Sequence, residues 1–171
     1  ATRAECRLRE DVHAFVALLK KYFPEFKNAE LLFTAAQTGV RETRHIKGEH
    51  VLTGEEYLNA VHFEDAVSRG AHPIDIHTAG DTTQKCQFLK NAAYIPYRSL
   101  IVPGFDNLLV AGRCFSADQV ASASVRVQAS VMGLGQAAGC AAAQCACAGT
   151  SVHKADVPTL QAMLRKWGAL I

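Results

Sequence analysis

The stretch Asn107-Leu108-Leu109-Val110-Ala111-Gly112-Arg113-Cys114-Phe115-Ser116-Ala117 decides how the chain folds. Residues 107–112 form a short, nearly continuous apolar run, which is typical of a strand buried on both faces of a parallel sheet. The small residues up to position 124 predict a loop, and a long helix is expected from about Val125 to Ala148. Ligands bind where a parallel strand ends and a helix begins, so the pattern predicts an anionic or dipolar ligand near residues 112–128. A capped structural helix with surface arginines is the alternative.

A glycine pattern follows inside the expected helix, at residues 133–139 (GLGQAAG). It resembles a dinucleotide fingerprint, but its spacing is wrong and its glycines lie in mid-helix, far beyond the strand end. We therefore reject it as a phosphate loop. Small residues recur every fourth position, and this stripe predicts a flat helix face clamped tightly against a sheet. Its members are Val131, Gly135, Gly139, Ala143 and Cys147.

Composition limits the classes of protein that the chain can be. The 171 residues are 49% hydrophobic and carry a net charge of +2, from 18 Lys and Arg against 16 Asp and Glu. That balance, without a basic stripe, argues against nucleic acid as a partner. The six cysteines are expected to be reduced thiols, which indicates a cytoplasmic location. No metal-ligand spacing is present, and the uncharged stretch 127–147 is too rich in Ala, Gly, Ser and Gln to favour a membrane span.

The rest of the chain alternates expected helices with extended segments. Helical periodicity predicts an amphipathic helix over residues 8–22, and 53–56 (TGEE) has the spacing of a capping box that opens a helix to about Val67. Residues 31–33 and 73–77 are expected to be strands, 41–48 a polar extended segment, and 93–101 an edge strand or bend at Pro96. Pro158 opens a last short helix.

Several separate motifs, in order, resemble one known family. They are residues 39–44 (GVRETR), 74–77 (IDIH), 95–100 (IPYRSL), 107–117, 123–127 (ASVRV) and 135–139 (GQAAG). Together they resemble the C-terminal half of the FAD-dependent oxidoreductases, relatives of the succinate dehydrogenase and fumarate reductase flavoproteins. The resemblance implies a flavoenzyme with FAD as cofactor. It also implies a fragment or separate C-terminal subunit, since the glycine-rich strand, turn and helix that bind the ADP half are not in this chain.

The resemblance also implies residues that hold the flavin. The 112–113 pair matches the segment near the pyrophosphate and ribityl chain, and the following loop passes the flavin ring. The start of the long helix would face the pyrimidine side of the ring, where positive charge favours its reduced form. The implied cofactor-binding residues are Gly112, Arg113, Ser116, Ser122, Ser124, Val125, Arg126 and Val127.

Further polar residues are candidates for substrate chemistry. Asp75 and His77 are expected on one face of a strand, where the carboxylate could orient the imidazole as a general base; a merely hydrogen-bonded strand histidine is the alternative. Arg41 and Arg44 are expected to share a face and to clamp a carboxylate or phosphate, or else to pair with Glu42. The remaining candidates are Tyr97 as a catalytic hydroxyl and Arg98 as a substrate contact.

The predicted fold is α/β, a partial FAD-binding domain of the glutathione-reductase type with a long buried helix and part of a mixed-sheet substrate domain. Residues 1–105 are expected to contribute the N-terminal helix and substrate domain, and 106–171 the returning part of the FAD domain. The predicted function is to help hold flavin and a small-molecule substrate for hydride transfer, with an N-terminal dinucleotide-binding half as partner. A non-catalytic interaction module is the alternative, and a homodimer is possible under both interpretations.

Overall fold

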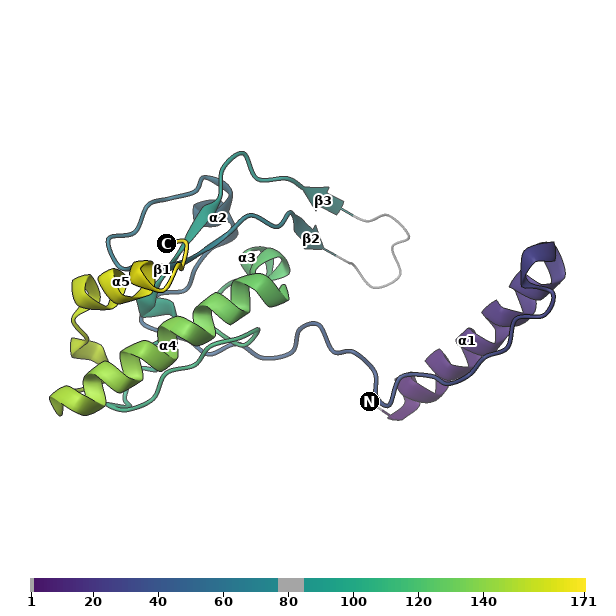
Figure 1. Cartoon of the computed structure of the whole chain (residues 1–171), viewed down its shortest axis with the longest axis horizontal. Coiled ribbons are helices and arrows are strands. Elements are labelled where there is room, and N and C mark those ends of the chain that lie inside the picture. The colour runs from purple at the N-terminus through teal and green to yellow at the C-terminus, as the bar shows by residue number, and fades with distance from the viewer. Residues whose placement is uncertain (1, 77–84) are drawn as a thin grey trace. The chain divides into compact units, whose positions relative to one another are not determined.

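The computed structural model describes residues 2–76 and 85–171. The chain divides into two compact units, residues 1–40 and 41–171. Figure 1 shows the helices and strands of both units in chain order. This division differs from the predicted boundary at residues 105 and 106, which concerned function and stays a prediction.

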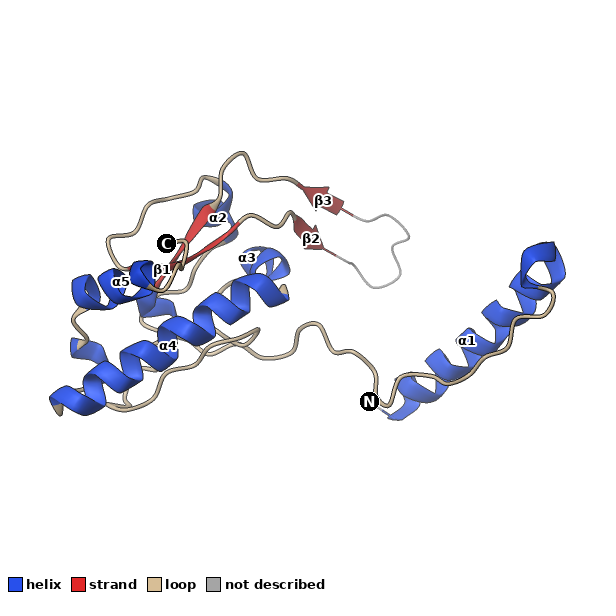
Figure 2. Cartoon of the chain, viewed as in Figure 1, coloured by secondary structure: helices blue, strands red, loops and turns tan. Residues whose placement is uncertain are grey.

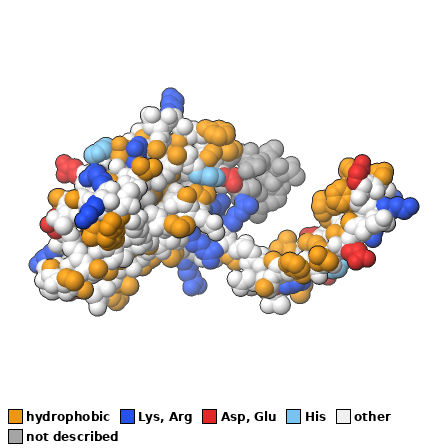
Figure 3. Space-filling view, in the orientation of Figure 1, with side chains coloured by type: hydrophobic (Ala, Val, Ile, Leu, Met, Phe, Trp, Pro, Cys, Tyr) orange, Lys and Arg blue, Asp and Glu red, His pale blue; other side chains and the backbone are white. Residues whose placement is uncertain are grey.

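The first unit consists of a long helix and the segment that returns along it. Helix α1 spans Thr2–Tyr22 and the short 3-10 turn η1 spans Pro24–Phe26. The predicted amphipathic helix over residues 8–22 is therefore confirmed and begins earlier. None of its side chains, all of which are described, is buried. Figure 3 shows the resulting exposed hydrophobic side chains along this unit.

The strand predicted at residues 31–33 is wrong. The segment has no strand pairing in the described chain, and Leu32 and Phe33 are 84% and 82% exposed. Three consecutive apolar residues resemble a buried strand in sequence, but they become one only where a neighbouring strand and a cover exist.

The described residues of the second unit form short strands and helices, shown by type in Figure 2. Its helices are α2 (Gly54–Leu58), α3 (Gln119–Val125), α4 (Gln128–Ala148) and α5 (Val157–Lys166). Its 3-10 turns are η2 (Tyr97–Ser99) and η3 (Val152–Lys154). The capping box at residues 53–56 is confirmed, because the Thr53 side chain accepts from the Glu56 backbone N–H and the Glu56 carboxylate accepts from the Thr53 N–H. The helix that it opens is shorter than the predicted one and ends at Leu58.

Two antiparallel strand pairs replace the expected parallel sheet. Strand β1 (Ala66–Gly70) pairs with β4 (Ala93–Pro96), and β2 (Ile74–Ile76) pairs with β3 (Lys85–Gln87). The expected strands near 73–77 and 93–101 are thus confirmed in shorter form. The buried parallel strand predicted at 107–112 is wrong. Within the described chain this segment makes only one antiparallel bridge, Ile101 to Leu109, and Leu108 is 39% exposed.

The long helix predicted from about Val125 to Ala148 is confirmed as α4, which begins three residues later, whereas part of the predicted loop before it forms the short helix α3. Val125 ends α3, Arg126 is the residue that caps it, and Val127 starts α4 in an extended conformation. The mid-helix position of Gly133 and Gly139 is confirmed, so the glycines do not form a phosphate loop. The helix also satisfies the length and hydropathy of a membrane span, a weak signal that core helices of soluble proteins share.

The predicted contact of the small-residue stripe with a sheet is wrong. Gly135, Gly139, Ala143 and Cys147 are exposed, and a Cβ added at either glycine would meet no described atom within 4 Å. The opposite face is the packed one. It buries Leu134, Ala137 and Ala141, and α4 packs there against β1 and α5.

One hydrophobic core holds the second unit together. Its largest fully buried side chains include Tyr57, Phe115, Leu52, Leu134, Leu160 and Leu164. They come from α2 and the residue Leu52 before it, from the loop before α3, and from α4 and α5, so the core joins elements distant in sequence. All six cysteines are free, and Cys140 and Cys145 are buried in this core as small apolar side chains.

Candidate functional site

The candidate site forms where α3 ends and α4 begins. Arg126 caps α3, and its guanidinium is held by two partners from other parts of the chain. Nη1 lies 3.5 Å from the Glu42 carboxylate, and Nη2 donates a 3.2 Å hydrogen bond to the carbonyl of Asp75. The side chain is 14% exposed, so the break between the two helices presents a positioned and largely sheltered positive charge.

Glu42 joins this arginine to the 112–118 loop. Its Oε1 lies 3.3 Å from Nε2 of His45, whose Nδ1 lies 3.1 Å from the Phe115 carbonyl oxygen. Both ring nitrogens of His45 therefore lie beside oxygen atoms, one of Glu42 and one of the Phe115 backbone. Sequence reasoning quoted Glu42 only as a possible pair for the arginines and gave His45 no role. Their close spacing in an extended charged segment is the signal that could have suggested a network.

Asp75 and Arg41 complete the charged cluster. Arg41 Nη1 lies 3.9 Å from the Asp75 carboxylate, while 62% of the Arg41 side chain is exposed. The prediction that Arg41 and Arg44 share a face is wrong, because residues three apart in an extended chain point in opposite directions. Arg44 is exposed and makes no ion pair or hydrogen bond within the described residues. His77, the predicted partner of Asp75, lies outside the described residues.

The predicted serines are buried and support the backbone around the site. Ser116 accepts a 2.9 Å hydrogen bond from the Gly48 N–H. Ser124 makes a 3.0 Å hydrogen bond to the Tyr57 hydroxyl and donates to the carbonyl of His72. Ser122 is 1% exposed, and its Oγ has no hydrogen-bond partner in the described part of the chain. The side chains of Ser116 and Ser124 therefore fix the loop and α3 from inside, whereas that of Ser122 does not.

Gly112 and Arg113 lie in a tight turn that leads into the site. Gly112 has φ +91°, a left-handed conformation that favours glycine, and its carbonyl accepts a 3.2 Å hydrogen bond from the Phe115 N–H. Arg113 is exposed on this turn. Val125 is fully buried in the core, whereas Val127 is partly exposed at the start of α4.

Tyr97 and Arg98 lie in a different part of the second unit. The Tyr97 hydroxyl donates a 2.9 Å hydrogen bond to the Val152 carbonyl, and burial raises the pKa of this phenol. Arg98 bonds to the Asp65 carboxylate at 3.0 Å, and these hydrogen bonds raise the pKa of its guanidinium. Both arrangements favour a structural role over contact with a substrate.

The N-terminus of α4 lacks a local cap. Val127 provides no side-chain hydrogen bond, the first turn carries no acidic residue, and Gln128 and Ala129 are exposed. Such a helix end leaves backbone N–H donors free and carries roughly half a positive charge. Next to Arg126, it favours an electronegative or negatively charged group.

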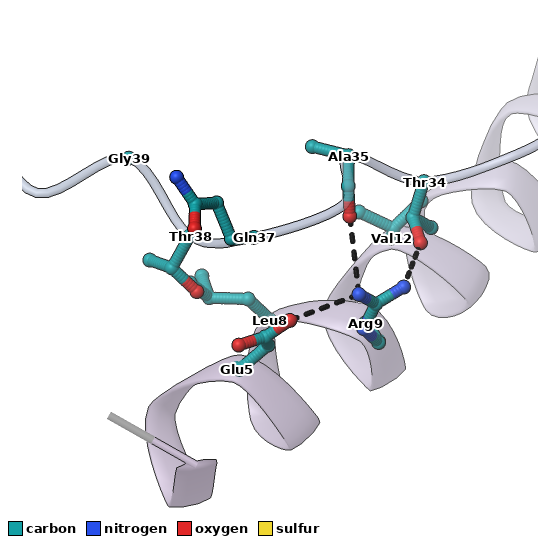
Figure 4. A pocket seen from close by; sticks show the side chains of 9 residues that line it. All are labelled: Glu5, Leu8, Arg9, Val12, Thr34, Ala35, Gln37, Thr38 and Gly39. Atoms are coloured by element: carbon teal, nitrogen blue, oxygen red, sulfur yellow. Dashed lines mark hydrogen bonds and ion pairs between the residues drawn. The ribbon is translucent and has the colours of Figure 1, made fainter.

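A separate pocket of ≈ 300 Å³ lies within the first unit, between α1 and the returning segment (Figure 4). Arg9 dominates it, donating to the Glu5 carboxylate at 2.9 Å, to the Ala35 carbonyl at 3.1 Å, and to the Thr34 hydroxyl. Because Arg9 is already engaged by these partners, the pocket is best explained as the contact that holds the returning segment on α1.

The chain matches the family model described as FAD dependent oxidoreductase over residues 1–164. The chain belongs to this family. No curated protein and no solved structure matches it. Members of the FAD-dependent oxidoreductase family depend on FAD, so the resemblance identified from the motifs is confirmed at the level of family and cofactor.

The α3–α4 junction fits one part of FAD. Free helix N–H groups and a guanidinium match the oxygens of the pyrimidine edge of the flavin ring, which gains negative charge on reduction. The described residues do not fit the ADP half of FAD. That half binds to a glycine-rich turn between a strand and a helix, whereas the closely spaced glycines of the described chain lie inside α4. The residues that fit are therefore those at the α3–α4 junction.

Proposed function

We propose that this chain is the C-terminal, flavin-facing part of an oxidoreductase related to the succinate dehydrogenase and fumarate reductase flavoproteins. One observation carries the proposal: Arg126 is held by Glu42 and the Asp75 carbonyl next to the uncapped start of α4. A positive charge fixed in place before the ligand arrives stabilises negative charge without reorganisation. In this proposal an N-terminal dinucleotide-binding half binds the ADP moiety.

Bound FAD supplies the ring that accepts a hydride from a small-molecule substrate. The residues of this chain do the rest. Arg126 and the α4 N-terminus stabilise negative charge at the pyrimidine edge, while Glu42 fixes the guanidinium in place. Asp75 with His77 is proposed to take the substrate proton, and Arg41 to orient the substrate, since it already lies beside Asp75. Arg113 is proposed to contact the pyrophosphate or ribityl region from its exposed turn.

Reconstitution with the N-terminal half tests the proposal. The full 171-residue chain is mixed with FAD alone, and with FAD and a separately produced dinucleotide-binding half encoded upstream. We expect weak or no flavin absorbance in the first mixture and a stable yellow complex in the second. Arg126→Ala should fold and should lower FAD affinity in the complex. Arg165→Ala, an exposed change in α5, should also fold and should leave FAD affinity unchanged. Failure of both mixtures to retain flavin would end the proposal.

The alternative of an interaction module also has an observation in its favour. The first unit exposes Phe15, Tyr22, Leu32 and Phe33, an apolar set that protein partners commonly cover. Size-exclusion chromatography with light scattering separates the alternatives, because a flavin-free module is expected to form a stable dimer or heteromer. A monomer without ligand would argue against it.

A further inference from the structure

A pocket of ≈ 510 Å³ lies beside the first turns of α4 and shares the α4 N-terminus, at Val127 and Ala129, with the candidate site. Its walls are β1, the segment after β1, the first turns of α4 and the C-terminal residues near Leu170. Gly133 brings the helix close to the strand here, since a Cβ at this position would lie 2.6 Å from Ser68 Oγ. The whole pocket belongs to the second unit and is open to solvent.

Two serine hydroxyls that line this pocket have no hydrogen-bond partner among the described residues. Ser68 and Ser130 are only 5% and 6% exposed, line the pocket, and make no hydrogen bond to any residue that the structure describes. Their oxygens are open to the pocket, so each hydroxyl can donate to a group that enters it. The buried atom without a partner beside them is Nε of Arg69, and leaving a buried donor unpaired costs about 1–3 kcal/mol.

The remaining polar side chains of the pocket also have unused donors. Arg69 donates from Nη2 to the Ala92 carbonyl at 2.9 Å and stacks on the Tyr94 ring, which fixes the guanidinium but leaves Nη1 without a partner in the described chain. Nδ1 of His72 is bonded to the Pro73 carbonyl, so Nε2 stays available. Gln136 adds an amide from the second turn of α4.

The charges around the pocket have one sign. None of the described residues that line it is acidic, one is an arginine, and the uncapped N-terminus of α4 begins at its rim with Val127 and Ala129. Apolar side chains such as Val67 form part of the wall. The cavity combines donors for oxygen, a positive potential and room for a small organic body.

We propose that this pocket binds the oxyanion group of a small organic molecule, a carboxylate or a phosphate ester. The Ser68 and Ser130 hydroxyls donate to the anionic oxygens, and Arg69 with the start of α4 supplies the charge. The described side chains that line the site all belong to this chain. It extends beyond the proposed function by naming the chemical class of a second ligand.

The first test is a titration of the full chain, without FAD, followed by amide chemical shifts. The probes are propionate, methyl phosphate and propionamide, the last being a neutral match for propionate. We expect the amide chemical shifts of the pocket residues to change saturably with an anion and not with propionamide. The anion that binds more tightly shows whether the natural group is a carboxylate or a phosphate ester. Equal responses to propionate and propionamide, or no saturable response from the folded chain to either anion, overturn the proposal.

A matched pair of charge variants forms the second test. Ala129→Asp places a carboxylate at the pocket rim, where it should weaken anion binding on the order of tenfold, about 1.4 kcal/mol. The same change lies in the first turn of α4, where negative charge favours the helix, so folding is expected to be retained. Met132→Asp adds the same charge on an exposed part of α4 that does not line the pocket, and it should bind like wild type. Unchanged affinity in Ala129→Asp contradicts the proposal.

The outcome for this pocket is separable from that for the flavin. If the reconstituted complex retains FAD but the chain binds no anion, the pocket proposal alone fails. If anions bind and flavin does not, the pocket stands and the proposed oxidoreductase function fails.

Discussion

Single charged side chains organise the candidate site. Glu42 contacts both Arg126 and His45, and all three are partly sheltered, with the Glu42 side chain 25% exposed. A carboxylate in that position pairs with the guanidinium of Arg126 and holds it in place. Its removal should therefore affect the site more than the fold.

Glu42→Gln tests this role. We expect a loss in unfolding free energy of no more than about 1 kcal/mol, because partly exposed ion pairs contribute little. FAD affinity in the reconstituted complex should fall, since Arg126 is no longer held. Urea unfolding and flavin titration measure the two effects, with exposed Glu55→Gln as the control. A change of several kcal/mol in stability would show that Glu42 is mainly structural.

Tyr97 is predicted to act through stability. In Tyr97→Phe the buried Val152 carbonyl loses its partner, which should cost about 1–3 kcal/mol. Burial raises the pKa of Tyr97 above its unfolded value of about 10, so the folded state keeps the phenol proton to a higher pH than the unfolded state does. The resulting stability is present below about pH 10 and is lost as the pH rises toward the folded pKa. Urea titrations at neutral and alkaline pH should show a smaller alkaline loss in Tyr97→Phe. A variant as stable as wild type that nevertheless loses oxidoreductase turnover in the complex would restore the catalytic role.

At the scale of the elements, the glycines of α4 divide into two faces. Gly139 is exposed, so Gly139→Ala should stabilise the helix by up to about 1 kcal/mol. Gly133 packs on β1, and Gly133→Ala pushes a Cβ against Ser68, so it should destabilise by about 1–3 kcal/mol. Thermal unfolding of the two variants should move in opposite directions. Equal destabilisation would mean that the small-residue stripe is packed after all.

Local signals predicted some elements well and failed at others. The Thr53–Glu56 capping box and Pro158 in the first turn of α5 specify their helix starts through backbone chemistry, and both are found. The strand prediction for residues 107–112 was wrong because apolar residues also occur in loops that pack against a core, as Leu109 does here. The contacts of Arg126 could not be predicted, because its partners Glu42 and Asp75 are distant in sequence. The network of Glu42, His45 and Arg126 could not be predicted from the sequence for the same reason.

For the molecule as a whole, the core determines which residues are needed for folding. Every member of the hydrophobic cluster, from Leu52 to Leu164, lies in the second unit. The first unit buries no residue of α1 and exposes several large apolar side chains. Cooperative stability of a domain comes mainly from buried apolar surface, so residues 41–171 should carry nearly all of it.

Deletion of residues 1–40 tests this distribution. The shortened chain, 41–171, should unfold cooperatively at a denaturant midpoint close to that of the full chain, since its core is intact. Helical circular dichroism should fall by the contribution of α1, while the near-ultraviolet signal of Trp167 in the second unit should persist. Limited proteolysis of the full chain should correspondingly cut the first unit early and leave the 41–171 body. A shortened chain that loses its cooperative transition would show that the first unit stabilises the core through contacts of its own.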